Sequence, residues 1–122
     1  MPKVIHFEIP AADTERALKF YTKVFGWKFD QYPGPMNYWL AKAGEDKETG
    51  INGAITQKGD VVNVTTNTIS VPSYEVAIKK IIEAGGKVLS EKTVVPTIGY
   101  MSYCQDTEGN VFGIMQIDSD AK

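Results

Sequence analysis

The sequence predicts an α+β domain made of two tandem βαβββ modules. The segments Phe7–Phe29 and Ile69–Leu89 share one order of apolar strand, proline, helix and glycine. They lie about 60 residues apart, and this spacing is longer than the period of most solenoid repeats. The halves also end alike, with GINGAI in the first and GNVFGI in the second. We place the modules at 1–57 and 60–117 of a single domain covering residues 1–122.

In the first module, Val4–Ile9 alternates and is rich in β-branched and aromatic residues, which predicts a strand that Pro10 ends. Asp13 is the expected N-cap of the helix and Gly26 its C-terminal residue. Helical spacing predicts a buried stripe of Ala17, Leu18, Tyr21, Val24 and Phe25. The three expected strands that follow are Trp27–Gln31, Tyr38–Lys42 and Ile51–Gln57.

The second module repeats this order. Val61–Val71 is expected to form a long strand, Ser73 to cap the helix, and the run 84–86 to end it. The expected buried helix face consists of Val76, Ile78, Ile81 and Ile82. The three expected strands that follow are Lys87–Val94, Tyr100–Gln105 and Val111–Ile117, with a turn over 106–110 between the last two.

Composition narrows the classes of function. The net charge of −2 gives no electrostatic reason to expect nucleic acid or an anionic membrane as a partner. No apolar run is long enough for a membrane span, and the N-terminus lacks the pattern of a signal peptide. The single cysteine, Cys104, allows no internal disulfide. We therefore expect a cytoplasmic protein.

These residues resemble the vicinal oxygen chelate superfamily, which includes glyoxalase I, bleomycin-resistance proteins and extradiol dioxygenases. The resemblance rests on HFEIPAADTERALKFYTKVFGWKF at the start, the AGGKV helix end, the DTEGNVFGIMQ ending and the duplicated module. It covers essentially the whole chain and is closest to small glyoxalase-related proteins. It implies a curved mixed sheet around a cavity between the modules. It leaves the chemistry open, since one fold carries many activities.

Strand alternation then indicates which side chains face that cavity. In the first strand, His6 and Glu8 share the concave face, while Phe7 and its alternating neighbours pack under the helix. The concave face of the long strand in the second module carries Thr66, Thr68 and Ser70. This polar wall suggests a ligand site or a wet cavity rather than core.

In metal-dependent members, the resemblance implies four cavity-facing ligands, one from the first and last strand of each module. The first position matches His6, whereas Gly53, Thr66 and Gly113 fall near the other three. Two glycines have no side chain and a neutral threonine is a poor ligand. We therefore expect no metal cofactor, although a weakly bound divalent metal stays open.

The candidate catalytic residues are His6 and Glu8, because a histidine and an inward-facing carboxylate can act as acid and base. Each also has a structural interpretation: His6 could bond Glu8, a threonine or water, and the threonines are common strand formers. The candidate ligand-binding residues are Thr66, Thr68, Ser70, Trp39 and Tyr100. Of Trp39 and its neighbour Tyr38, one is expected to pack in the core.

Three functions remain. The first is a metal-independent protein that binds a small, partly apolar molecule between the modules. The second is an enzyme, of lyase, isomerase or dioxygenase type, acting on a small carbonyl or thioester substrate with His6 and Glu8 as acid and base. The third is a scaffold with a vestigial cavity, which the polar wall disfavours. The open edges of the two sheets favour a homodimer.

Overall fold

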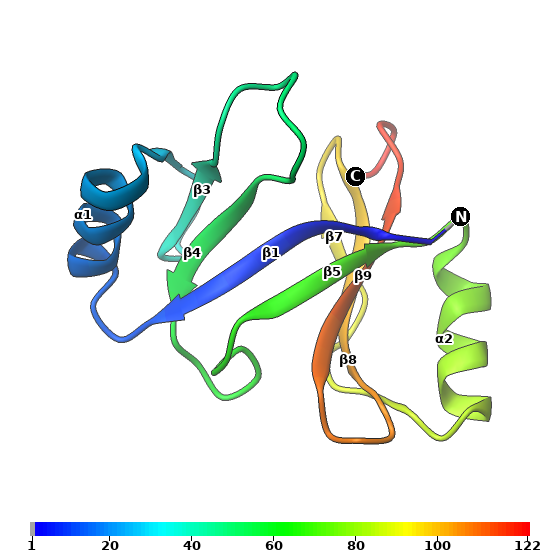
Figure 1. The fold of residues 1–122 in the computed structure, drawn as a ribbon. Coiled ribbons are helices and arrows are strands. Elements are labelled where there is room, and N and C mark those ends of the chain that lie inside the picture. The colour runs from blue at the N-terminus through cyan, green and yellow to red at the C-terminus, as the bar shows by residue number, and fades with distance from the viewer. Residues whose placement is uncertain (1) are drawn as a thin grey trace. The chain divides into compact units, whose positions relative to one another are not determined.

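The computed structural model describes residues 2–122, and its contacts divide the chain into two compact units. One unit is His6–Thr66, and the other is Asn67–Lys122 with the segment that ends at Ile5. Each unit contains one helix and several paired strands (Figure 1). The predicted α+β class and the duplicated order of elements are confirmed.

The first unit follows the predicted order. Its elements are β1 (Val4–Ala11, of which this unit holds the part from His6 onward), α1 (Thr14–Phe25), β2 (Lys28–Gln31), β3 (Tyr38–Lys42) and β4 (Gly53–Gln57). The strands lie in the order β2-β3-β4-β1, with β4 parallel to β1 and the other pairs antiparallel. The prediction that Pro10 ends the first strand is wrong: Pro10 pairs with Thr56, and one residue later Lys58 N–H donates to the Ala11 carbonyl at 2.9 Å.

Both predicted ends of α1 are confirmed. Asp13 Oδ1 accepts a hydrogen bond from Arg16 N–H at 3.1 Å, which satisfies a free donor of the first turn. Gly26 has φ 73°, and its N–H donates to the Thr22 carbonyl at 2.9 Å. This left-handed conformation is open to glycine without a Cβ penalty.

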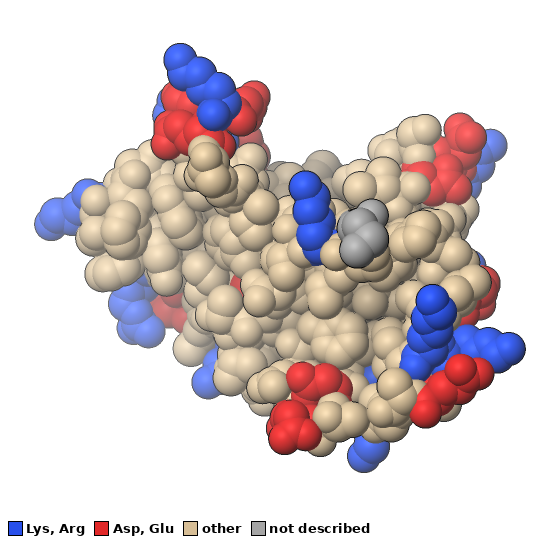
Figure 2. All heavy atoms as spheres, turned by 45° about the vertical axis from the view of Figure 1, so that its right-hand side comes forward, with Lys and Arg blue, Asp and Glu red and all other residues tan. Residues whose placement is uncertain are grey.

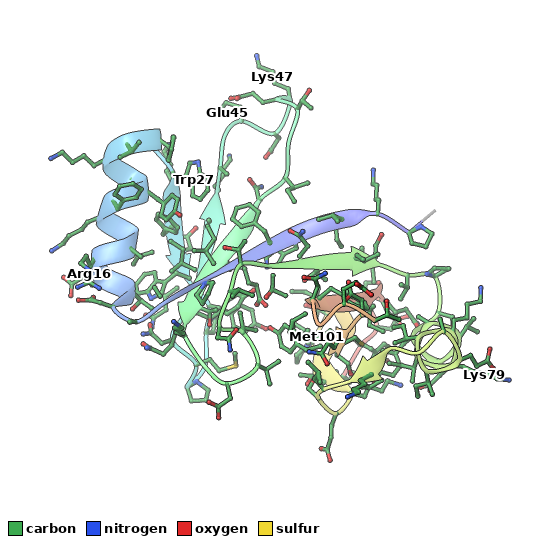
Figure 3. All side chains as sticks on the ribbon, turned by 60° about the horizontal axis from the view of Figure 1, so that its bottom comes forward. Arg16, Trp27, Glu45, Lys47, Lys79 and Met101 are labelled. Atoms are coloured by element: carbon green, nitrogen blue, oxygen red, sulfur yellow. The ribbon has the colours of Figure 1, made fainter. Side chains whose placement is uncertain are left out.

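The predicted buried stripe of α1 is only partly correct. Tyr21 stacks on Trp27 with ring centroids 4.9 Å apart, and Trp27 lies between α1 and the strands of its module (Figure 3). In contrast, Val24 is 53% exposed and Phe25 61% exposed. The apolar side chains at the C-terminal end of α1 therefore lie largely in solvent.

The second unit contains β5 (Thr66–Ser70), α2 (Tyr74–Glu83), β6 (Lys87–Val88), β7 (Thr93–Val95), β8 (Gly99–Gln105) and β9 (Val111–Ile117). Its strands lie in the order β5-β9-β8-β6, and β7 also pairs with β8. Here too the first and last strands of the module, β5 and β9, are parallel. The expected cap is present, since Ser73 Oγ accepts from Val76 N–H at 3.2 Å.

Two strands of the second module are shorter than the sequence predicts. Residues 61–65 of the expected long strand are not extended: a turn joins Gly59 N–H to the Val62 carbonyl, and Thr66 Oγ1 donates to the Val64 carbonyl. The expected strand Lys87–Val94 is interrupted at 89–92, giving β6 and β7. Both pieces pair with β8, so the interruption bulges one strand without changing the topology.

The core of the second unit lies between α2 and the sheet. Tyr74, Cys104 and Ile114 are buried at its centre, and Ile78 and Ile81 pack against them as predicted. The other two predicted members of the helix face, Val76 and Ile82, are 51% and 58% exposed. Tyr74 Oη and Ser102 Oγ share a buried hydrogen bond of 2.6 Å, so the phenol is satisfied inside this core.

Charged groups are mixed on the surface. On the face shown in Figure 2, Lys and Arg lie beside Asp and Glu in small groups, which agrees with the net charge of −2. Among residues 2–122, neither helix is long and apolar enough to cross a bilayer.

Candidate functional site

The register of the first unit separates two faces of its sheet. Phe7 pairs with Gly53, and its ring lies against Trp27 with centroids 5.6 Å apart, so this is the face that α1 covers. His6 and Glu8 alternate with Phe7 and therefore lie on the other face. The predicted orientation of these three side chains agrees with the structure.

His6 is paired with Tyr38 from β3. Its Nε2 lies 2.8 Å from the Tyr38 hydroxyl, and the two rings are nearly parallel, with an interplanar angle of 14°. Burial lowers the pKa of the His6 imidazole below its ordinary value of 6.5, while the negative charge of Glu8 acts in the opposite direction. The net effect favours a neutral imidazole at pH 7, which has one donor and one acceptor nitrogen.

Glu8 is a buried carboxyl group, 4% exposed, two residues along the same strand face. Such a group needs hydrogen bonds or nearby charge in place of water. Across the described residues, no buried side-chain nitrogen or oxygen lacks a hydrogen-bond partner. A molecule that binds beside Glu8 must therefore exchange hydrogen bonds with groups that already have partners.

Tyr38 is the site residue that sequence reasoning did not select. Trp39 was expected to bind a ligand, but it pairs with Ile55 and so lies on the α1-covered side, where its Nε1 donates to Asn37 Oδ1 at 3.0 Å. Tyr38 pairs with Thr56, and Thr56 pairs with Pro10. Because Pro10 lies on the same strand face as His6, Tyr38 lies on the His6 face as well. The antiparallel register between β3 and β4 was the missing information.

The three polar residues of β5 have different surroundings. Thr66 is fully buried and its hydroxyl donates to the Val64 carbonyl at 2.9 Å, while Thr68 is 5% exposed. The Ser70 hydroxyl lies 3.4 Å from the Lys3 carbonyl, and Ser70 N–H donates to the same oxygen at 2.9 Å. Thr66 and Ser70 thus use their polar groups within the fold.

Tyr100 lies with the core of the second unit. It packs against the cluster of Tyr74, Cys104 and Ile114, and the ammonium of Lys92 lies 4.7 Å from the centroid of its ring. Thr68 pairs with Gly113 and Gly113 with Tyr103, so Thr68 faces away from that cluster. Tyr100 and Thr68 therefore lie on opposite faces of their sheet.

Comparisons with known proteins identify the family. The model of the family described as "Bleomycin resistance protein-like N-terminal" matches residues 3–40. A "Glyoxylase-like domain-containing protein" of Didymella fabae is 32% identical over 115 residues, covering 88% of each chain. The chain belongs to the glyoxalase/bleomycin resistance/dioxygenase superfamily.

Solved structures agree with membership of this superfamily at the level of fold. A superfamily member from Vibrio splendidus 12B01 has a TM-score of 0.69 at 12% identity, covering 97% of this chain and 100% of that one. A variant methylmalonyl-CoA epimerase of Streptomyces coelicolor, in complex with 2-nitronate-propionyl-CoA, has a TM-score of 0.71 at 13% identity, covering 98% and 97%. At these identities the likeness concerns the fold alone.

Two of the positions that the resemblance assigns to metal ligands are glycines that lie against neighbouring side chains. A Cβ added at Gly53 would lie 2.5 Å from the Phe7 ring, so this position belongs to the α1-covered packing and faces away from His6. At Gly113 an added Cβ would lie 3.0 Å from the Thr68 hydroxyl. Within residues 2–122, no three His, Cys, Asp or Glu side chains are grouped so that they could hold a metal ion.

Proposed function

We propose that this superfamily member binds a small, uncharged carbonyl compound on the His6 face of its first module, through side-chain hydrogen bonds and without a metal. The observation that carries the proposal is the 2.8 Å contact between His6 Nε2 and the Tyr38 hydroxyl, on the same sheet face as the buried Glu8. Two neutral groups that already form a hydrogen bond offer further donor and acceptor capacity to a third polar group.

The charges on this face favour an uncharged ligand. A neutral imidazole and a phenol recognise a carbonyl or hydroxyl oxygen, whereas an anion requires a cation or several amide donors. The negative charge of Glu8, which opposes the effect of burial on the pKa of His6, also repels a carboxylate or phosphate placed beside them. The same face therefore favours an uncharged ligand over an anion.

The apolar part of the ligand has a surface to contact. Leu40 pairs with Ala54, which pairs with Glu8, so Leu40 lies on the His6 face and is 40% exposed. Small-molecule sites combine apolar side chains with a small number of polar groups, and Leu40 and the His6–Tyr38 pair are one of each kind. A carbonyl or thioester compound with a short alkyl group matches both parts.

A second function, catalysis of proton transfer, is favoured by Glu8. A carboxylate on the same face as a neutral His6 can accept a proton from carbon next to a carbonyl, while His6 and Tyr38 hydrogen-bond the oxygen that gains negative charge. Glu8 is only 4% exposed, which restricts its contact with a substrate. For this reason we place binding first and catalysis second.

One pair of probes tests both functions. The neutral thioester S-propionyl-N-acetylcysteamine is compared with its anionic analogue S-succinyl-N-acetylcysteamine by ¹H–¹⁵N NMR titration. We expect the neutral thioester to shift the His6 signals, and the anionic analogue to bind more weakly. Deuterium incorporation next to the thioester carbonyl, measured in D₂O, reports proton transfer. Incorporation that Glu8→Gln abolishes would establish the catalytic function.

Matched variants on one strand locate the ligand. Tyr38→Phe removes one hydroxyl and is expected to weaken binding about 2–10-fold, the usual effect of a single hydrogen bond. Trp39→Phe changes the adjacent residue on the opposite face and is expected to leave affinity unchanged. Equal losses in both variants, or no shift of the His6 signals with either thioester, would contradict the proposed site.

A further inference from the structure

Two tyrosine rings and a carboxylate surround the ammonium group of Lys92. Its Nζ atom lies over the ring of Tyr100, 4.7 Å from the centroid, and over the ring of Tyr74, 5.1 Å from the centroid. It also donates a hydrogen bond to Glu75 Oε1 at 3.0 Å. Aromatic faces attract ammonium groups, and a nearby carboxylate adds charge attraction. We call Tyr74, Tyr100 and Glu75 the ammonium cage; all three belong to the second unit.

The aromatic walls of the cage are held by contacts that do not involve Lys92. Tyr74 is 6% exposed, its hydroxyl shares the buried hydrogen bond with Ser102, and its N–H donates to Gln116 Oε1 at 2.7 Å. Tyr100 lies on β8, which is paired with β7 on one side and β9 on the other. Both tyrosines also pack in the core of the second unit. We therefore expect the two rings to keep their positions when the Lys92 side chain leaves, so that the cage is a preformed site.

Lys92 itself is held weakly. It lies in the interruption 89–92 between β6 and β7, its side chain is 43% exposed, and the side chain of Glu75 is 75% exposed. An ion pair this exposed contributes little, because water screens it and two flexible side chains must be ordered to form it. The long lysine stem also lets the ammonium reach water while its carbon atoms stay on apolar surface. Lys92 is thus a tethered competitor for the cage that a second cation can displace.

The distances in the cage favour a methylated ammonium ion. A methyl carbon bonded to a nitrogen at the Lys92 Nζ position and directed at either ring would lie about 3.2–3.6 Å from the ring centre, since a C–N single bond is about 1.5 Å long. This is close to the ordinary contact distance between carbon atoms. A quaternary ammonium ion also has no N–H group that loses hydrogen bonds to water when it enters an aromatic site.

We propose that Tyr74, Tyr100 and Glu75 bind a small trimethylammonium compound, which enters when the Lys92 side chain moves into solvent. The nitrogen of the ligand replaces Lys92 Nζ, its methyl groups contact the two rings, and Glu75 balances its charge. With two aromatic walls and an exposed carboxylate, we expect affinity in the millimolar range. The site uses no residue of the His6 face and takes a cation, whereas the ligand proposed for the His6 face is uncharged.

A ¹H–¹⁵N NMR titration with tetramethylammonium chloride tests the site, with sodium chloride as the control for ionic strength. We expect saturable shifts of the Tyr74 and Tyr100 signals in the wild type. Lys92→Ala is expected to tighten binding at least about fivefold, because it removes the tethered competitor. The matched control Lys79→Ala removes the same charge from an exposed position on α2 (Figure 3), and it is expected to bind like the wild type.

Two further comparisons separate recognition of a cation from apolar contact. Lys92→Ala is expected to bind choline at least about tenfold more tightly than 3,3-dimethyl-1-butanol, its uncharged carbon analogue. Adding Glu75→Gln to Lys92→Ala is expected to weaken tetramethylammonium binding about 2–10-fold, whereas adding Glu83→Gln, at the exposed far end of α2, is expected to leave it unchanged. Urea unfolding checks that each variant is folded.

Three results would overturn the inference. The first is the absence of saturable shifts of the Tyr74 and Tyr100 signals in the folded Lys92→Ala variant. The second is equal affinity of that variant for choline and for the uncharged analogue. The third is binding to Lys92→Ala with none to the wild type at the same concentrations, because Lys92 would then keep the cage closed to any ligand.

Discussion

Adding one methyl group at Gly53 tests the packing that separates the two faces of the first module. In Gly53→Ala, the new Cβ would lie 2.5 Å from Cγ and Cδ1 of Phe7 and 2.5 Å from the Phe7 carbonyl oxygen. Ordinary van der Waals contact begins near 3.4 Å, so the methyl must displace both a ring and a backbone atom. The change is therefore an overpacking substitution.

The surroundings of Phe7 set the magnitude. Its ring lies against Trp27, which stacks on Tyr21 of α1, so displacing Phe7 displaces a chain of aromatic contacts. The carbonyl belongs to a strand paired with β4 and can move only by distorting that pairing. Overpacking costs typically about 1–3 kcal/mol, and with a backbone atom involved we expect about 3 kcal/mol or more.

Equilibrium urea unfolding measures the effect as a lower midpoint at unchanged slope. Gly59→Ala is the matched control, because a Cβ there meets nothing within 4 Å, and it should change the free energy of unfolding by less than about 0.5 kcal/mol. Combining Gly53→Ala with Phe7→Leu should cost less than the sum of the two single changes, since the smaller side chain frees space. A loss below about 1 kcal/mol for Gly53→Ala would refute the packing argument.

Three further predictions concern single residues. His6 is the one histidine of the chain, so its NMR titration can be assigned without ambiguity. We expect its titration midpoint to lie below 6.5 and to be lowered further by Glu8→Gln. We also expect the free energy of unfolding to fall as the pH drops from 6.5 toward that midpoint, because the unfolded chain takes up the proton first. A titration at or above 6.5 would contradict the effect of burial. Cys104 is fully buried, and burial raises the pKa of its thiol to about 11. A thiol reagent such as DTNB should therefore react slowly with the native protein and fast with the protein unfolded in urea. Equal rates would show that the thiol is accessible in the native protein. Thr97 has φ 65°, which is unfavourable for a β-branched residue. Thr97→Gly should therefore raise the free energy of unfolding by about 1 kcal/mol, measured by urea unfolding. A loss of stability would show that the Thr97 side chain contributes more than the backbone strain costs.

The sequence was sufficient where a local pattern has a single physical solution. Asp13 and Gly26 bound α1 because few other residues satisfy a free N–H or adopt a left-handed backbone. Alternation placed Phe7 under the helix and His6 on the other face, since side chains of a strand must alternate.

Features that depend on pairing between distant segments could not be predicted in this way. Tyr38 rather than Trp39 joins His6, because the register of β3 on β4 decides which side chain points to which face. Val24 and Phe25 are exposed although helical periodicity places them in the apolar stripe, because periodicity does not report which neighbouring segments cover each residue. Gly53 was assigned to the cavity wall by position, whereas its neighbour across the strands is Phe7.

The parallel pairing of first and last strands has a consequence for synthesis. The register joins Phe7 to Gly53 in one module and Thr68 to Gly113 in the other, so neither sheet can complete its closing ladder until its last strand has left the ribosome. Pairing between such distant segments must form against a large loop-closure entropy. The first module can close while the second is still being translated, but β5 has to wait for β9, which spans Val111–Ile117. A nascent chain stalled before residue 111 would therefore expose β5 and β8 without their common neighbour, and these strands are where we expect chaperones to bind first.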